Sequence, residues 1–289
     1  MDRHIGDYVL WVLCVDDQAF EVLSRLDFTC VRCLKLSDLE TPELLSVKQS
    51  RTIGEYCWTL TPFAPRFVFE ADQSIDRVTY IDADLWFLKN PIGIFDEFNL
   101  SAKHVLITEH AYALDYDQSA KSGKYCVQFM TFSRNGGEYV RHWWEERCIE
   151  WCFDKFEDGK FGDQKYLDDW TERFSDLVHV LQDRHLTLAP WNASRFPYVG
   201  AVFFHFHGLK LISNTSVEIG EYYLPLSFRQ HVYIPYLQDL RSSISLLESV
   251  DFHPRSQVRN LTFPKYLMRL FRRQIASSTP SCTNGRIDF

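Results

Sequence analysis

Short apolar runs alternate with segments of helical periodicity along most of the chain. The run YVLWVLCV (8–15) indicates a buried strand, and DDQAFEVLSRL (16–26) after it has helical spacing with acidic residues in its first turn. Further strands are expected at 31–36, 78–81, 104–110, 124–134 and 202–207, and further helices at 36–48, 52–72 and 136–156. The 52–72 helix is expected to be interrupted near Pro62 and Pro65. This alternation predicts an α/β fold, with helices on both sides of a sheet and ligands at the carboxyl ends of its strands.

Composition narrows the class of protein. With 289 residues, 46% hydrophobic and 16% aromatic, the chain can bury a large core. Its net charge of −8 argues against a nucleic-acid partner. No apolar run approaches the roughly 18 residues needed to cross a bilayer. The first residues carry their apolar stretch between acidic residues, without a small-residue cleavage site, so a cytoplasmic protein is expected.

The eight cysteines are expected to be free thiols. Cys30 and Cys33 have the CxxC spacing, but on a strand they would face opposite ways. Cys148 and Cys152 would share one helix face, most simply a buried one. Without a histidine or a further cysteine at close spacing, structural zinc is not expected.

Two carboxylates interrupt the apolar stretch RVTYIDADLWFLKNP (77–91). In an extended chain, Asp82 and Asp84 leave the same face, so both would project from a strand end and repel each other unless a cation lies between them. The alternative is a solvated turn in which the aspartates cap the next element of the chain. The apolar residues on both sides, 78–81 and 85–88, favour the end of a buried strand.

Two further stretches each allow a structural and a functional interpretation. GKFGDQKYLDDW places Asp163 and Gln164 at an expected helix start, where an aspartate can simply be an N-cap. LAPWNAS sets Trp191 beside Asn192 in a loop, which is either ordinary turn chemistry or a platform that contacts a sugar.

The stretch VFFHFHGLK (202–210) is the most specific. A buried-strand run ends in His205 and His207, Gly208 lets the backbone approach a ligand closely, and Lys210 supplies a point charge. A lone strand histidine is usually a packed core residue. Two on one face, followed by glycine and lysine, favour a ligand site.

Two carboxylates, an imidazole and a lysine together would suit a hard divalent cation that faces an anionic ligand. Oxygen ligands with one imidazole suit Mn²⁺ or Mg²⁺ better than Zn²⁺. Such a metal would neutralise a diphosphate leaving group, which the transfer of a sugar from a nucleotide sugar demands. Neither GxGxxG nor GxxxxGK occurs in the chain, so the phosphates would be held by metal and lysine.

The order of YIDADLWF, GDQKYLDD and FHFHGLK resembles the GT-A fold glycosyltransferases of family eight, which include bacterial lipopolysaccharide galactosyl- and glucosyltransferases. The resemblance implies a GT-A-like, Rossmann-type mixed sheet flanked by helices in residues 1–212 and a partly helical carboxyl-terminal extension in 213–289. It also implies a hexosyltransferase that retains anomeric configuration. The implied partners are a nucleotide-sugar donor, most simply a UDP-sugar, and a glycan or lipid-linked acceptor.

Site residues carry over by motif. Asp82 and Asp84 match the metal-binding DxD of that family, and His205 matches its third metal ligand, with His207 as an accessory or an alternative ligand. Asp163 and Gln164 match the DQ motif, whose aspartate lies near the donor sugar and the acceptor in the relatives.

Donor contacts carry over less directly. The family's phosphate-binding lysine lies slightly farther past the glycine than Lys210 lies past Gly208. Many members carry an arginine in the helix before the DxD, where this chain reads EYCWTL. The candidate donor contacts there are Tyr56, Arg51 and Lys48. Trp191 and Asn192 complete the expected donor-binding set.

The start of the chain departs from the family. Relatives open with a strand and loop that hold the nucleotide base, followed by a helix whose end resembles MDRHIGDY, the first residues here. We therefore expect the sheet to lack a central strand and the donor site to lack one wall. Either the start codon was placed internally or the product is crippled.

Two other function classes stay open. A phosphatase of the haloacid dehalogenase type also uses a DxD after a strand, but Trp86 stands where its threonine belongs. An inactive relative would bind a partner or a nucleotide without turnover, which an incomplete sheet would favour.

The segment NLTFPKYLMRLFRRQ (260–274), here the basic segment, gathers four positive charges around an apolar stripe. Its basic residues are Lys265, Arg269, Arg272 and Arg273. As a helix it would either pack on the catalytic domain with its charges in water, or lie on an anionic inner membrane where a lipid-linked acceptor would be met.

Overall fold

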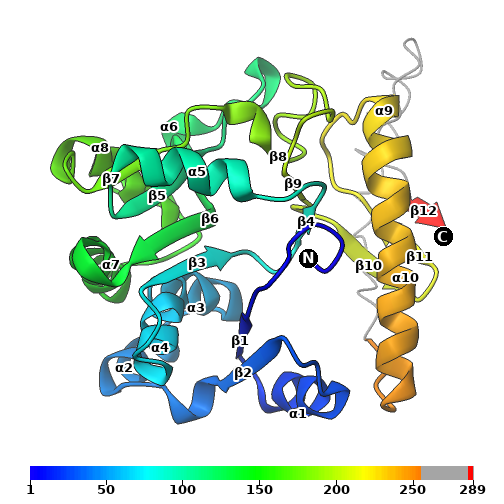
Figure 1. Ribbon diagram of the computed structural model, residues 1–289, viewed down its shortest axis with the longest axis horizontal. Coiled ribbons are helices and arrows are strands. Elements are labelled where there is room, and N and C mark those ends of the chain that lie inside the picture. Colours follow the sequence, from blue (N-terminus) through cyan, green and yellow to red (C-terminus); the bar gives the residue numbers. More distant parts are fainter. Residues whose placement is uncertain (255–285, 289) are drawn as a thin grey trace.

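Helices and strands alternate as the apolar pattern predicts in the computed structural model, which describes residues 1–254 and 286–288 (Figure 1). The strands are β1 (Leu10–Cys14), β2 (Val31–Lys35), β3 (Arg77–Ile81), β4 (Leu85–Phe87), β5 (Val105–Glu109), β6 (Tyr125–Ser133), β7 (Val178–Val180), β8 (Thr187–Leu188), β9 (Phe203–His205), β10 (Lys210–Ser213), β11 (Ser216–Glu218) and β12 (Arg286–Asp288). The α-helices are α1 (Asp17–Leu26), α2 (Pro42–Lys48), α3 (Ile53–Leu60), α4 (Phe63–Ala71), α5 (Ile92–Ser101), α6 (Ser119–Ser122), α7 (Arg134–Glu150), α8 (Trp170–Arg173), α9 (Leu226–Phe228) and α10 (Ile234–Ser249). Short 3₁₀ or π turns are η1 (Leu36–Asp38), η2 (Leu114–Tyr116), η3 (Gln164–Asp169), η4 (Arg184–Leu186) and η5 (Arg229–Tyr233).

The described strands form four small sheets, in the orders β1-β2, β3-β6-β5-β7, β4-β9-β8 and β10-β11-β12. In the second of these, here the central sheet, β3 and β5 are antiparallel to β6, and β7 is parallel to β5. The predicted mixed α/β fold is therefore confirmed.

Helices cover both faces of the central sheet, because neighbouring strand residues point to opposite faces. On one face, Trp144 of α7 belongs to the same core cluster as Ile107 and Met130. On the other face, Phe98 of α5 packs in a cluster with Leu106 and Phe129. This double cover buries β5 and β6 and fixes the strand positions from which the site is built.

The sheet is interrupted between β1 and β3. Among the described strands, β1 pairs with β2 alone and β3 with β6 alone. Leu13 of β1 nevertheless packs against the same cluster as Leu60 and Phe63 of the helices beside β3. Two strand edges without a partner thus lie on one shared helical layer, as expected for a sheet that lacks a central strand.

The expected 52–72 helix is interrupted where the prolines predict. The α3 helix ends at Leu60 and α4 begins at Phe63, since Pro62 between them has no N–H to continue the hydrogen-bond ladder. Pro65 lies in the first turn of α4, where a missing N–H costs nothing.

The expected 136–156 helix differs at both ends. It begins at Arg134, but Asn135 and Gly136 have non-helical backbone angles, so regular geometry starts at the second glycine of the pair. It ends at Glu150 because Trp151 is extended, with φ −157 and ψ 121. The expected 36–48 helix is likewise divided into η1 and α2.

The chain after residue 212 packs against the strands that carry the site. The ring centroids of Phe204 and Phe228 lie 5.7 Å apart, and those of Phe206 and Tyr233 lie 4.9 Å apart. In Figure 1, α10 runs beside the sheet of β10, β11 and β12.

The division into two domains at residue 212 stays a prediction, and the basic segment lies outside the described residues. Within the part of the chain that is described, no helix has the length and apolarity needed to cross a membrane.

Candidate metal centre

Three predicted metal ligands meet where two sheets touch. Asp82 and Asp84 follow the last residue of β3, and β4 begins directly after them. Because β4 is antiparallel to β9 and pairs Leu85 with His205, the histidine lies beside the second aspartate. The Phe206 N–H donates to the Asp84 carbonyl and continues this pairing (2.9 Å).

The side chains of Asp82, Asp84 and His205, here the metal cluster, converge on one point. Each offers a ligand atom within 4.8 Å of the others. His205 Nε2 lies 2.9 Å from Asp84 Oδ1 and 3.7 Å from Asp82 Oδ2. Two carboxylates and one imidazole suit a hard divalent cation. His207 lines the same cavity but does not belong to the cluster.

Side chains from β3 and β6 hold two of these ligands in place. The Tyr80 hydroxyl donates to Asp82 Oδ1 (2.8 Å). The Nδ1–H of His205 donates to Gln128 Oε1 (2.8 Å), which leaves Nε2 facing the carboxylates. The imidazole is therefore oriented with Nε2 toward the proposed metal.

Burial and charge act against each other on these ligands. Burial raises the pKa of Asp82, although the nearby imidazole of His205 lowers it. Burial also favours the neutral form of Asp84, but the hydrogen bond and charge of His205 outweigh it and lower that pKa. Burial lowers the pKa of His205, and its contact with Asp84 outweighs that effect and raises it. The contact with the carboxylates thus favours the protonated imidazole, and a bound metal would take the place of the proton at Nε2.

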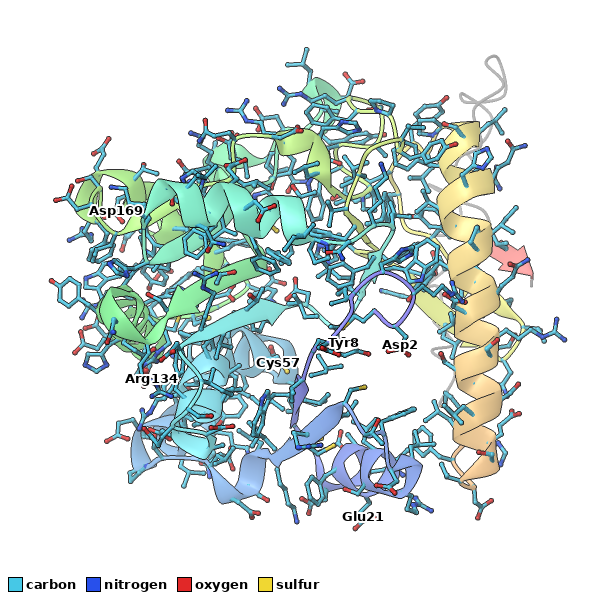
Figure 2. All side chains as sticks on the ribbon, viewed as in Figure 1. Asp2, Tyr8, Glu21, Cys57, Arg134 and Asp169 are labelled. Carbon is cyan, nitrogen blue, oxygen red and sulfur yellow. The ribbon has the colours of Figure 1, made fainter. Side chains whose placement is uncertain are left out.

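The metal cluster lies in the wall of a cavity of about 510 Å³. Besides the cluster, it is lined by Cys57, Trp58, Thr61, Tyr80, Ala83, His110, Tyr112, Gln118, Ser122, Cys126, Val127, Gly162, Asp163, Gln164, Trp191, His207 and Tyr222. Figure 2 shows Cys57 on α3 toward the middle of the molecule, whereas Arg134 and Asp169 lie toward its edge. Aromatic rings beside carboxylates and hydroxyls make this wall suitable for a ligand with both apolar and hydroxyl-bearing faces.

Asp163 lines this cavity and is only 3% exposed. It precedes η3, yet its side chain makes no capping hydrogen bond. Trp144 Nε1 donates to its backbone carbonyl (2.8 Å), and its Oδ2 has no partner among the described residues. Burial raises the pKa of Asp163 to about 7, with a further increase from the charge of Asp82 and an opposing hydrogen bond from Thr61. These contacts favour a ligand-binding role over an N-cap.

Trp191 and Asn192 are brought together behind the cluster. Trp191 Nε1 and Asn192 Nδ2 both donate to the His110 carbonyl, at 2.8 and 3.1 Å. Trp191 lines the cavity and lies edge-on to His205, with ring centroids 5.3 Å apart. Asn192 is fully buried and shapes the loop without lining the cavity.

The other predicted donor contacts lie outside the cavity lining. Gly208 has φ +77 in the turn after β9, a backbone conformation that favours glycine, and Lys210 begins β10. Tyr56 of α3 is buried and donates to Glu40 Oε1 (2.7 Å). The role of these three residues in donor binding stays a prediction.

Several lining residues were not predicted from the sequence. His110 and Tyr112 follow β5, and their rings stack with centroids 4.6 Å apart. Their position directly after an apolar strand is the sequence feature that could have indicated a place in the site. Tyr222 comes from the chain after residue 212, and its ring lies 6.3 Å from His207. No local sequence pattern indicates that Tyr222 lines the cavity.

The cysteines are as expected. All seven that the structure describes are free thiols, and Cys148 and Cys152 are fully buried. Among the described histidine, cysteine, aspartate and glutamate side chains, those of the metal cluster are the one group of three close enough to share an ion.

Comparisons with known proteins place the chain among bacterial relatives. No protein-family model matches it. It is 28% identical over 232 residues to the uncharacterized protein YfnF of Bacillus subtilis (strain 168), which covers 73% of this chain and 76% of YfnF. It is also similar to the uncharacterized protein YfnD of the same strain, over 272 residues that cover 86% of this chain and 85% of YfnD.

Two solved structures are more distantly similar. One is the apo form of mouse xyloside xylosyltransferase 1, with 18% identity and a TM-score of 0.45 over 71% of this chain and 88% of that one. The other is a glycosyltransferase involved in the glycosylation of the major capsid of PBCV-1, with 11% identity and a TM-score of 0.43 over 71% of this chain and 93% of that one. The identity to YfnD is 30% over most of both chains, and the protein therefore belongs to the YfnD family.

Proposed function

We propose that the protein is a metal-dependent glycosyltransferase that moves a sugar from a nucleotide-sugar donor to a glycan or lipid-linked acceptor. The observation that carries this proposal is the cluster of Asp82, Asp84 and His205 in the wall of a cavity of about 510 Å³. A cavity of this size is in the range of small-molecule sites. The order of the DxD, DQ and HFxG motifs in the sequence supports the same function.

The metal cluster would hold Mn²⁺ or Mg²⁺. The side chain of Asp84 is 45% exposed, so the cluster is open toward the cavity and leaves positions for ligands from a substrate. When bound, the cation supplies positive charge that stabilises a diphosphate leaving group. Tyr80 fixes the carboxylate of Asp82 for that task, and the buried His205 contributes its Nε2.

Asp163 and Gln164 would orient the sugar and the acceptor. Both line the cavity, and the unpartnered Oδ2 of Asp163 is available to a ligand. Because burial raises the pKa of Asp163 to about 7, the carboxyl is present in both forms at neutral pH. It can therefore accept a hydrogen bond from a sugar hydroxyl or donate one to it.

The finer parts of the proposal rest on the family-eight resemblance. They are a UDP-sugar donor, retention of configuration, a hexose as the transferred sugar and lipopolysaccharide-type acceptors. Trp191 would contribute to the sugar-binding wall. Lys210 and Gly208 would contact parts of the donor beyond the lined cavity, and the buried Asn192 and Tyr56 would support its walls from behind.

A cytoplasmic location at the inner membrane would follow if the basic segment binds anionic lipid. Each basic residue near such a surface contributes about 1 kcal/mol, so its four charges would give a weak, salt-sensitive attachment. A lipid-linked acceptor would then be met at the membrane surface.

A second candidate is a binding protein that holds a nucleotide or a partner without turnover. The interruption between β1 and β3 favours it, because a discontinuous sheet would hold a donor less firmly. This candidate shares the metal cluster with the first and differs from it only in chemistry.

Incubation of the purified protein with UDP-glucose, UDP-galactose, UDP-N-acetylglucosamine and GDP-mannose separates the two. We expect release of free nucleotide from at least one donor with Mn²⁺ and none with EDTA. Asp176→Asn, a change at an exposed carboxylate, is the matched control and should behave as the wild type. Binding of a donor in a thermal-shift assay without any release would favour the binding protein. Neither binding nor release of any donor would overturn the proposal.

A further inference from the structure

We propose that Gln128 is a positioning residue for the metal centre, which sets the imidazole of His205 and the backbone of Asp82 in place. This inference rests on the proposed function, because it takes the cluster of Asp82, Asp84 and His205 to be a metal site. No motif in the sequence marks Gln128, which lies inside the apolar run of β6.

Gln128 contacts two of the three ligand residues with two different groups. Its side-chain Oε1 accepts a hydrogen bond from His205 Nδ1 (2.8 Å). Its backbone carbonyl accepts one from the Asp82 N–H (3.0 Å), one residue past the last β3–β6 pair, Ile81 with Phe129. Two strands that carry ligands, β3 and β9, are thereby fixed to one residue of the central sheet.

The hydrogen bond to Oε1 also selects the tautomer of His205. A carboxamide oxygen can only accept, so His205 Nδ1 must carry the proton. Loss of the proton from Nε2, the atom that lies 2.9 Å from Asp84 Oδ1, then leaves a lone pair there for a metal. Histidines that bind metals commonly donate their other N–H to such a partner, which fixes ring orientation and raises ligand basicity.

Packing alone does not account for a glutamine at this position. Gln128 is 0% exposed, and its Nε2 has no hydrogen-bond partner among the described residues. A buried amide nitrogen without a partner destabilises a fold, so an apolar residue of the same length would pack at lower cost. The retained carbonyl oxygen is the part of this side chain with a partner, and that partner is His205.

The substitution Gln128→Met tests this role, because it keeps the length of the side chain and removes the acceptor. Mn²⁺ affinity, measured by electron paramagnetic resonance without any donor, should fall about 10–100-fold. Gln128→Glu keeps an acceptor and should stay within a few-fold of the wild type. Met130→Leu, at a buried position two residues farther along β6, is the control and should leave affinity unchanged. Far-UV circular dichroism reports whether each variant is folded.

Nitrogen-15 spectra of the histidines in the Mg²⁺-loaded wild type give a second readout that needs no variant. They should show His205 protonated at Nδ1. Protonation at Nε2 instead would overturn the inference. So would Mn²⁺ binding by a folded Gln128→Met variant with the affinity of the wild type, which would leave the proposed metal site standing. If the wild type binds no Mn²⁺ at all, the proposed function loses its metal site and this inference falls with it.

Discussion

Replacing Asp163 by asparagine should make the stability of the protein less sensitive to pH. Burial raises the pKa of this carboxyl from 3.8 to about 7, so the native state keeps a proton that the unfolded chain releases. Above the unfolded pKa this opposes folding, and the penalty grows with rising pH until it levels off above about pH 8. At 1.36 kcal/mol per pKa unit, the part that develops between pH 5 and pH 8 is about 2.6 kcal/mol.

An asparagine cannot ionise and escapes this penalty, but its buried amide nitrogen adds a cost of about 1–3 kcal/mol that does not depend on pH. We therefore expect the stability of Asp163→Asn relative to the wild type to increase by about 2.6 kcal/mol between pH 5 and pH 8. Urea denaturation in EDTA at both values measures the two free energies of unfolding. The exposed Asp176→Asn is the control and should show the same difference from wild type at both pH values. A difference for Asp163→Asn that also stays constant would refute the account of this carboxyl.

The remaining predictions concern the metal cluster, the DQ motif and the basic segment. Asp82→Asn, Asp84→Asn and His205→Ala should each lower Mn²⁺-dependent donor hydrolysis by orders of magnitude with little loss of folding, and full activity of an aspartate variant in EDTA would contradict this. Tyr80→Phe removes one hydrogen bond to Asp82 and should weaken Mn²⁺ binding about tenfold in the same resonance assay. Asp163→Asn should still bind a UDP-sugar in a thermal-shift assay but lose transfer, whereas a capping residue would leave turnover near wild type, since asparagine caps nearly as well. The full chain should sediment with anionic liposomes at low salt and release at high salt. Reversal of the four basic-segment charges to glutamate should abolish this sedimentation, and unchanged partitioning would favour the packed-helix interpretation.

The sequence predicted the elements that carry the site because their apolar periodicity is strong. The run before Asp82 is β3, and the run before His205 is β9. The two motifs meet because β4 and β9 pair directly. The family resemblance linked these motifs, since periodicity alone does not say which strands are neighbours.

Gln128 and Asp163 could not be assigned from periodicity, because their roles depend on tertiary contacts. The pairing of β3 with β6 places Gln128 beside Asp82, and a shift of one residue would turn its side chain to the other face. The two interpretations of Asp163, N-cap and cavity residue, differ only in whether its carboxyl is buried. Packing of η3 against β6 decides this, and no local pattern encodes it.

The helix ends illustrate the same limit. Prolines marked the break between α3 and α4, because a missing N–H acts locally. The end of α7 at Glu150 has no such marker, since the apolar pattern continues through Trp151 and Cys152. The chain leaves the helix at Trp151, which has an extended backbone, and Cys152 after it is fully buried.

The central claim is that Asp82, Asp84 and His205 form a divalent-cation site for a nucleotide-sugar donor. An anomalous difference map from crystals soaked with Mn²⁺ and UDP tests it most directly. The account predicts one strong manganese peak within bonding distance of Asp82, Asp84 and His205 Nε2, with the UDP diphosphate completing its coordination. Bound UDP with no manganese peak at these three side chains, or manganese held at other residues, would contradict it.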